Sequence, residues 1–217
     1  MKQITVWGFT QVPPFAHGLV RDLRVRWALK EAGLAYESRA IDPAERKADA
    51  WQSKHPFGLV PVLEIDGRIS IESGAIIHAI AEQCETLMPS DLRTETLTWM
   101  FAALNTVEPA LWNLFVLDKL HSGEEWTRLR RAGVVDEVKG RLGALAGWLD
   151  DRDYLLGRFT AADILMTTVL RFIRYTELLA EFPSLEAYVK RCEARPAFQG
   201  ALREQIAGYE RHAAIAA

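Results

Sequence analysis

The chain has 217 residues, which is enough to bury a substantial core and to form one large or two small domains. It is 49% hydrophobic and 25% charged, with a formal net charge of −3 and no dense block of lysine and arginine. These values are ordinary for a globular protein and argue against nucleic acid or an anionic membrane as the main partner. No apolar run approaches the roughly 20 residues that span a bilayer.

Cysteine usage and the N-terminal sequence indicate the compartment. The chain has only Cys84 and Cys192 and contains no CxxC motif. This pattern fits a reducing cytosol and argues against a disulfide framework or a zinc site. The N-terminus lacks the apolar segment of a signal peptide. We therefore expect a cytoplasmic protein without a metal, with both cysteines packed inside helices.

The first 84 residues alternate between strand and helix patterns. Short runs of β-forming residues predict strands, and apolar residues at helical spacing predict helices. Asp66-Gly67 is a strong two-residue hairpin signal. In chain order we expect a strand over Ile4–Phe9, a helix over 19–33, a strand over 35–41, a short helix capped by Asp42, strands over 62–65 and 68–71, and a helix from Ser73. The order predicts a βαβαββα domain over residues 1–84.

Strand patterns disappear after residue 85. Asp91 is expected to cap a long helix that runs to about Leu120, and a charged amphipathic helix follows over 123–150. Further helical patterns cover residues 159–175, 183–195 and 196–212. The sequence therefore predicts an all-α domain over residues 91–217.

Pro61 stands between Val60 and Val62, inside a stretch that otherwise predicts a strand. Proline has no N–H to give to a sheet, so it belongs at a strand start, an edge or a bulge. The plain interpretation is a trans proline that begins the strand. A cis Val60-Pro61 bond would instead turn the N–H and C=O of Val60 outward, where an extended peptide can pair with them as an added strand.

Glu72 and Ser73 precede the next helix. On a purely structural interpretation, Ser73 is the N-cap of that helix. The functional interpretation adds that a helix N-terminus offers N–H groups and partial positive charge to a carboxylate. The Glu72 carboxylate beside it suits an ammonium group, so the pair matches an amino-acid head group.

Three stretches carry a family resemblance: HPFGLVPVLEIDGRISIESGAIIHAIAE, RVRWALKEAGLAYE and FTAADI. With the order of elements, they resemble the cytosolic glutathione S-transferase superfamily over nearly the whole chain. The implied fold is an α/β thioredoxin-like N-terminal domain, with a mixed four-stranded sheet, followed by the all-α domain. In FTAADI, Thr160 would cap a buried helix, Asp163 would reach back to the cap N–H, and Phe159 would pack on Ile164 as a hydrophobic staple.

The resemblance also implies binding residues for glutathione, the expected cosubstrate. Val60, ahead of Pro61, resembles the residue whose backbone pairs with the glutathione cysteine, and Glu72 and Ser73 resemble the γ-glutamyl clamp. Either Arg46 or Lys47 would bind the glycine carboxylate, and a solvated helix face is the other interpretation of these two cations. The chain departs from many relatives at Leu59, where a lysine or glutamine is common.

A second departure concerns the residue that activates the thiol. The family places Ser, Cys or Tyr near the start of the first helix, but here the Ser or Cys position falls at Leu19 or Gly18. Thr10 and His17 are the candidate replacement donors, and Arg21 could stabilise a thiolate by charge. Backbone N–H groups at the helix N-terminus are the remaining candidate.

The resemblance implies a transferase that lowers the pKa of the glutathione thiol and delivers the thiolate to a small hydrophobic electrophile. A pocket between the domains, with side chains such as Trp99, Trp112 and Phe115, is expected to hold the acceptor; interhelical core is the alternative for these aromatics. A homodimer is also implied. The rival functions are a glutathione-dependent peroxidase or disulfide reductase, and a non-catalytic interaction module with this fold.

Overall fold

The computed structural model describes residues 3–216, and side chains as far as residue 214. Contacts between Cα atoms divide the chain into two compact units. The N-terminal unit comprises Met1–Leu87 together with Arg195–Ala217, and the helical unit comprises Met88–Ala194. The sequence-based division assigned all of residues 91–217 to one helical domain, whereas the last helix packs in the N-terminal unit.

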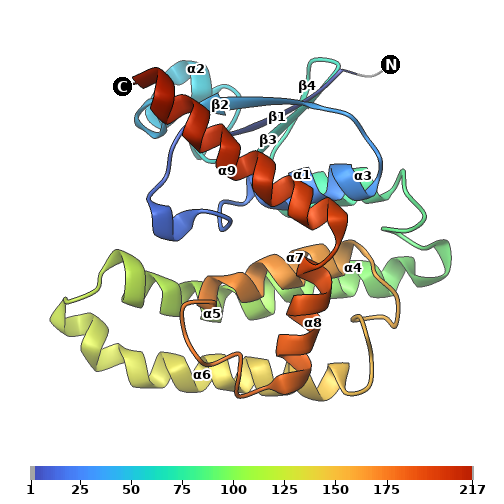
Figure 1. The fold of residues 1–217 in the computed structure, drawn as a ribbon, viewed down its shortest axis with the longest axis vertical. Helices are drawn as coiled ribbons and strands as arrows, with labels where there is room; N and C mark the ends of the chain where they lie inside the picture. Colours follow the sequence, from blue (N-terminus) through green and yellow to red (C-terminus); the bar gives the residue numbers. More distant parts are fainter. Residues whose placement is uncertain (1–2, 217) are drawn as a thin grey trace. The chain divides into compact units, whose positions relative to one another are not determined.

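A mixed four-stranded sheet forms the centre of the N-terminal unit (Figure 1). Its strand order is β2-β1-β3-β4, with β1 and β2 parallel and the other neighbours antiparallel. The turn residues Asp66 and Gly67 have φ values of 49° and 80°, as a two-residue hairpin turn requires. The strands are β1 (Ile4–Phe9), β2 (Glu37–Ile41), β3 (Val62–Ile65) and β4 (Arg68–Ser70).

The two faces of β1 are covered by different elements. Val6 is fully buried, and a Cβ atom at Gly8 would lie 2.8 Å from a carboxylate oxygen of Asp22 in α1 (Asp22–Glu31), so this face meets α1. Trp7 points the other way and packs 5.5 Å, between ring centroids, from Trp51 of α2 (Asp49–Gln52). The alternation follows from the period of two along a strand.

The remaining helices of this unit pack around α1. α3 (Ser73–Ala81) lies against α1, and α9 (Pro196–Ala216) also packs on it (Figure 1). Before α2, where the sequence predicts the start of a short helix, Pro43–Lys47 form a 3-10 helix. Its predicted cap is confirmed, because the Asp42 carboxylate accepts the N–H of Ala44 at 2.8 Å.

The helical unit is built around one wholly buried helix, α7. Two predictions are wrong here and nearby. Asp91 does not cap α4; it lies in a 3-10 turn and pairs with Arg158. Cys84 lies outside a helix, whereas Cys192 is buried in α8. The helices are α4 (Arg93–Phe101), α5 (Glu108–Phe115), α6 (Glu125–Leu149), α7 (Ala161–Leu170) and α8 (Pro183–Glu193), with π-helical turns at Ala102–Val107 and Val116–Leu120.

The helical stretch Ser90–Leu120 is long enough to cross a membrane, and its most apolar window has a mean hydropathy of 1.3. Half of that window is buried inside the protein. Core helices of globular proteins have the same properties, and α4 and α5 contact α7 in this way. We therefore interpret the stretch as a core helix.

The start of α7 carries the predicted capping box. Thr160 is the N-cap, and Asp163 accepts the Thr160 N–H at 2.8 Å. Asp163 is fully buried and also accepts the Leu155 N–H at 3.0 Å and the Tyr188 hydroxyl at 3.0 Å. Burial raises the pKa of Asp163 to about 6, against the opposing effect of these hydrogen bonds. The predicted staple between Phe159 and Ile164 stays a prediction.

Candidate functional site

The first part of the candidate site is the segment that leads into β3. The Val60-Pro61 peptide bond is cis, which is the less common of the two alternatives for this bond. The paired register of β3 begins after it, with Val62 opposite Trp7 of β1 and Leu63 opposite Ser70 of β4. Pro61 therefore precedes the paired part of the strand. A proline is tolerated there because no sheet hydrogen bond requires its missing N–H.

Glu72 holds the position between β4 and α3. It is exposed, it is the N-cap of α3, and its φ of 65° and ψ of 111° place it in a region that side chains rarely adopt. In the described part of the chain only two other non-glycine residues, Asp66 and Asp150, share a positive φ. Strain of this kind is typical of binding and catalytic sites.

Ser73 is the first residue of α3 and not its N-cap, which corrects the structural interpretation of its role. The side chain is buried, with the residue only 5% exposed. Its Oγ accepts a hydrogen bond of 3.2 Å from Nη1 of Arg24, in the first turn of α1. The starts of α1 and α3 are therefore joined at this hydroxyl. Sequence analysis missed Arg24, although an arginine early in an otherwise amphipathic helix was visible.

His55 was also missed. His55 is only 2% exposed, and its Nδ1 atom has no hydrogen-bond partner among the described residues. Burial lowers the pKa of His55, and the charge of Glu72 opposes this effect, so the two side chains lie close enough to interact. The charge of the exposed Glu72 carboxylate thus acts on a buried imidazole.

Gly58, in the loop before β3, packs against the segment that carries the predicted cations Arg46 and Lys47. Its φ is 64°, and a Cβ atom there would lie 2.4 Å from the carbonyl oxygen of Arg46. Only glycine fits such a close approach. The Pro56–Gly58 loop therefore packs on the backbone of Arg46, whose own side chain, like that of Lys47, is exposed.

The candidate thiol-activating residues lie in the loop between β1 and α1. Thr10 directly follows β1, and its N–H donates to the Ile41 carbonyl at 2.9 Å. His17 follows a 3-10 turn over Pro14–Ala16, and its ring lies 5.0 Å from that of Tyr209 in α9. Arg21 is the N-cap of α1 and so stands one residue before the helix.

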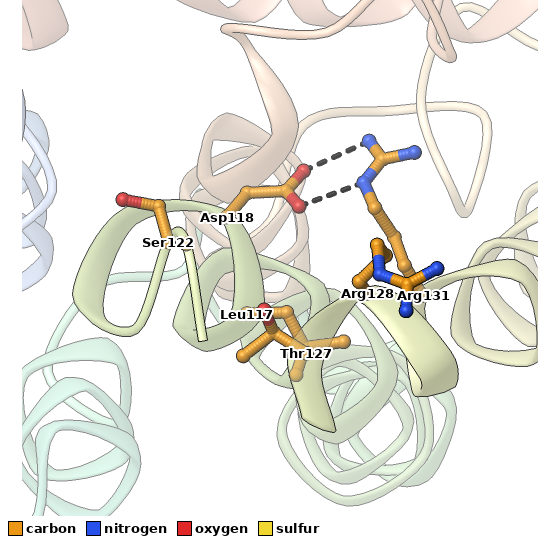
Figure 2. Close-up of a pocket in the computed structure, with 7 residues that line it drawn as sticks. Leu117, Asp118, Ser122, Thr127, Arg128 and Arg131 are labelled. Carbon is orange, nitrogen blue, oxygen red and sulfur yellow. Dashed lines mark hydrogen bonds and ion pairs between the residues drawn. The ribbon is translucent and has the colours of Figure 1, made fainter. Parts of the chain in front are cut away.

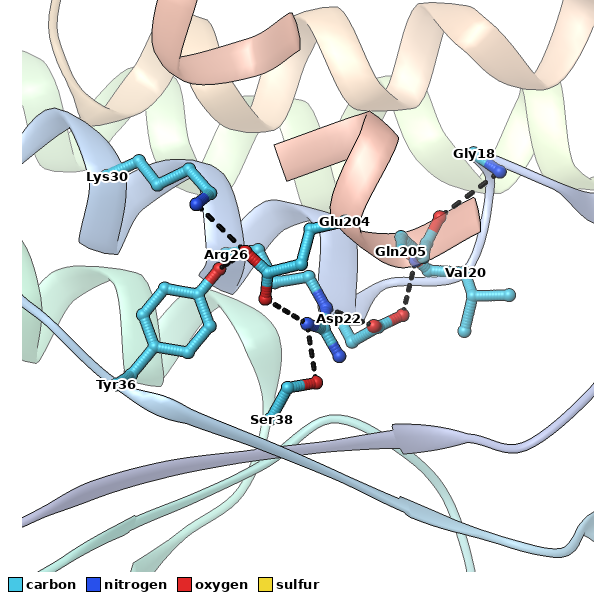
Figure 3. A network of polar contacts seen from close by, with 9 residues as sticks. All are labelled: Gly18, Val20, Asp22, Arg26, Lys30, Tyr36, Ser38, Glu204 and Gln205. Carbon is cyan, nitrogen blue, oxygen red and sulfur yellow. Dashed lines mark hydrogen bonds and ion pairs between the residues drawn. The ribbon is translucent and has the colours of Figure 1, made fainter. Parts of the chain in front are cut away.

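A buried polar network holds this loop and α1 to α9 (Figure 3). Gln205 accepts the Gly18 N–H at 3.2 Å and donates to the Val20 carbonyl at 3.2 Å and to Asp22 at 2.6 Å. Asp22 also pairs with Arg26 at 2.7 Å. The backbone at Gly18, which with Leu19 is one of the two positions that the resemblance gives for the family's hydroxyl or thiol, is therefore fixed by α9.

The network continues on the far side of Arg26. Its guanidinium donates to Ser38 at 2.8 Å and pairs with Glu204 at 2.7 Å (Figure 3). Glu204 also accepts from Tyr36 at 2.9 Å and pairs with Lys30 at 2.8 Å. Burial and the Glu204 charge raise the pKa of Tyr36 above its ordinary range, so this hydroxyl stays a donor.

Comparison with known families agrees with this geometry. Residues 23–86 match the profile described as glutathione S-transferase, N-terminal domain, and residues 130–196 match glutathione S-transferase, C-terminal domain. The maleylacetoacetate isomerase of Rhizobium meliloti (strain 1021) is 32% identical over 192 residues, which cover 82% of this chain and 89% of the relative. The chain belongs to the glutathione S-transferase superfamily.

Other members of the superfamily are similar over comparable lengths. A glutathione S-transferase of Antechinus stuartii is 26% identical over 178 residues, covering 79% of this chain and 78% of the relative. The crystal structure of a glutathione transferase from Burkholderia graminis, with two glutathione molecules bound per subunit, superimposes with a TM-score of 0.80 at 25% identity. That alignment covers 92% of this chain and 87% of the other.

The aromatic residues expected at the acceptor site lie within the helical unit of this superfamily member. Phe115 is buried, and its ring lies 5.4 Å from that of Trp112 and 5.6 Å from that of Phe172. The ring of Trp99 lies 5.0 Å from that of Trp148 in a tilted arrangement. These contacts give Phe115 a core position, as the alternative interpretation held, while Trp99 and Trp112 stay partly exposed.

The helical unit also has an open pocket of about 290 Å³ beside the start of α6 (Figure 2). Arg131 lines it and binds Asp118 through two hydrogen bonds of 2.8 and 2.9 Å. Although burial opposes it, these bonds and the charge of Arg131 keep the pKa of Asp118 below its ordinary value. The guanidinium of Arg131 in this pocket is thus already paired with a carboxylate. Residues 3–216 include no group of three His, Cys, Asp or Glu side chains placed to hold a metal.

Proposed function

We propose that this protein binds glutathione and conjugates its thiolate to a small hydrophobic electrophile. The observation that carries the proposal is the start of α3, where a strained Glu72 stands beside a buried Ser73. An exposed carboxylate next to a hydroxyl at a helix N-terminus suits the ammonium and carboxylate of a γ-glutamyl group. The family membership and the glutathione bound in the Burkholderia graminis protein support the choice of ligand.

Each part of glutathione has a proposed partner. Glu72 takes the γ-glutamyl ammonium and Ser73 the carboxylate beside it. The backbone of Val60, ahead of the cis Pro61, pairs with the cysteine residue as a short added strand. Arg46, whose backbone packs against Gly58, is the proposed partner of the glycine carboxylate, and Lys47 is its alternative.

The thiol would lie beside the start of α1. A free thiol titrates near pH 8.5, so about 3% is thiolate at pH 7. Thr10 and His17 are the proposed side-chain donors to the sulfur, and the Arg21 charge is a third aid. The α1 N-terminus adds partial positive charge to whichever group acts.

An aryl halide assay separates these candidates. If one side chain activates the thiol, its removal in Thr10→Val, His17→Ala or Arg21→Ala raises the apparent thiol pKa by about one unit and leaves glutathione affinity within twofold. The assay is the pH profile of turnover for each variant. Three unchanged profiles would leave the α1 backbone N–H groups as the activator.

The second candidate function is reduction of a disulfide or a peroxide, in which a second glutathione resolves the first. One observation favours it: the Burkholderia graminis protein holds two glutathione molecules per subunit. Parallel assays with an aryl halide, a hydroperoxide and a mixed disulfide of glutathione distinguish the reactions. The name of the Rhizobium meliloti relative adds maleylacetoacetate isomerisation as a fourth assay.

Binding itself is tested by retention on immobilised glutathione. A non-catalytic interaction module without the ligand would pass through the column, and that result would exclude both proposed reactions.

We further propose a cytoplasmic homodimer, in keeping with the superfamily resemblance. Sedimentation at micromolar concentration, giving a species of about twice the 24.5 kDa chain mass, is the check.

A further inference from the structure

We propose that Arg24 is a positioning residue that fixes Ser73 as a carboxylate donor, and thereby makes the start of α3 select γ-glutamyl groups that retain their α-carboxylate. The inference rests on the proposed function, because it concerns how glutathione is held. It adds Arg24 of α1, which is not itself one of the proposed glutathione-binding residues. It also assigns to Arg24 the selectivity for the α-carboxylate of the γ-glutamyl group.

The first argument concerns the hydroxyl. A serine hydroxyl has one proton to donate and two lone pairs. In Ser73 one lone pair is occupied by the N–H of Arg24, at 3.2 Å. The proton remains for another partner, and that partner must be an acceptor. A hydroxyl that accepts from a cation is also polarised and becomes a better donor.

The second argument concerns charge. Arg24 is only 2% exposed, and its guanidinium keeps its charge at any physiological pH. A ligand carboxylate bonded to Ser73 would lie two hydrogen bonds, or about 6 Å, from this cation. Attraction over that distance is stronger in a buried setting than in water. An ammonium placed at the same point would be repelled, which directs it toward the exposed Glu72.

The third argument comes from the neighbouring arginine. Arg26 is also buried, but it lies two residues further along α1 and therefore on a different side of the helix. Its guanidinium is engaged by Asp22, Ser38 and Glu204. α1 thus carries one buried arginine for the network with α9 and another that reaches the start of α3. Arg26 provides a matched control.

The experiment compares two ligands by calorimetric titration of the full chain. One is reduced glutathione, and the other is its analogue with a 4-aminobutanoyl group in place of the γ-glutamyl group, which keeps the ammonium and lacks the carboxylate. Wild type is expected to prefer glutathione at least tenfold. In Arg24→Gln, the Kd for glutathione rises about tenfold while the Kd for the analogue stays within twofold, so the preference is lost. Arg24→Lys, which keeps the charge, retains most of it.

The matched variant Arg26→Gln is expected to keep the wild-type ratio of the two Kd values, whatever it does to stability. An equal loss for both ligands in Arg24→Gln, or no loss for either, overturns the inference. If wild type binds neither ligand, the proposed function falls and this inference falls with it. A wild type that binds glutathione while Arg24→Gln keeps the ratio overturns the inference alone.

A measurement on wild type covers the case in which Arg24→Gln does not fold. The guanidinium Nε–H signal of Arg24, assigned through Arg24→Lys, is followed by NMR in the ¹⁵N-labelled protein. Glutathione should shift it and the analogue should not. Equal shifts with the two ligands overturn the inference.

Discussion

The starts of α7 and α3 solve the same problem in opposite ways. Each helix begins with N–H groups that have no partner within the helix. At α7 the chain supplies the partners itself through Thr160 and Asp163, both fully buried. At α3, no side chain among the described residues makes a cap hydrogen bond, the N-cap Glu72 is strained, and Ser73 is held from the side by Arg24.

The difference teaches how a folding motif and a ligand site can be told apart. The α7 start is closed by its own buried capping box, so it contributes to stability. The α3 start keeps its N–H groups and partial charge available at the cost of a strained residue. We expect substitutions at α7 to change stability, and substitutions at α3 to change binding.

The largest effect is expected at Asp163. Asp163→Ala removes the acceptor of two backbone N–H groups and the Tyr188 hydroxyl, all buried. Leaving such donors unpaired lowers the free energy of unfolding by about 3–5 kcal/mol in total. Urea unfolding at pH 7 measures it, with exposed Asp151→Ala as the control, expected within about 0.5 kcal/mol of wild type. A small loss of unfolding free energy in Asp163→Ala would contradict the view that this capping box stabilises the start of α7.

The pH dependence of the same carboxyl is the next largest effect. Because burial raises its folded pKa to about 6, above an unfolded value of about 4, its contribution to stability is fully present below about pH 4. It is lost as the pH rises through about 6, by about 3 kcal/mol. The unfolding free energy of wild type minus that of Asp163→Asn should fall by about 2 kcal/mol of this between pH 4 and pH 7. A flat or rising difference would refute the raised pKa.

Ser73→Ala tests the other helix start. Loss of the carboxylate donor is expected to raise the Kd for glutathione about tenfold, or about 1.4 kcal/mol. Stability should change less, by about 1 kcal/mol, because Arg24 loses one hydrogen bond. Calorimetry and urea unfolding on the same sample give both numbers. Unchanged affinity in a folded variant would mean that α3 is not the clamp.

The smallest effect concerns Tyr209, beside the start of α1. Its hydroxyl is buried without a partner, next to a cavity of about 40 Å³ that is lined by Asp22 and Arg26. Removing an unpaired buried hydroxyl costs little, so Tyr209→Phe should match or exceed wild-type stability by up to about 1 kcal/mol. The ring contact with His17 remains possible in the variant. A loss above about 1 kcal/mol would show that the hydroxyl has a bound partner in solution, such as a water molecule.

Much of the fold could be predicted because local signals agree with tertiary structure. The apolar run over Ile4–Phe9 forms β1 with the expected bounds, and Asp66-Gly67 forms the expected turn. Prediction failed where contacts between residues far apart in the sequence determine the structure. Asp91 has a good cap side chain, but Arg158 binds it, and the partner of α9 is a helix far away in the sequence.

The candidate site could be predicted only in part, for the same reason. Glu72, Ser73 and Pro61 stand in a recognisable local pattern. Arg24 and His55 do not, since nothing within a few residues of either reveals that Arg24 bonds to Ser73 or that buried His55 senses the charge of Glu72. The register and rotamers that bring them there arise from packing of α1 and of the loop before β3. No residue spacing encodes these contacts.

The packing of α9 against α1 has a consequence for synthesis of the protein on the ribosome. The first 87 residues emerge without Glu204 and Gln205, so buried Asp22 and Arg26 then lack these two partners. Domains usually fold as units in order of translation, but this unit acquires α9 only after the helical unit, Met88–Ala194, has been synthesised. A nascent N-terminal unit would therefore wait, incompletely stabilised, while the whole helical unit is made.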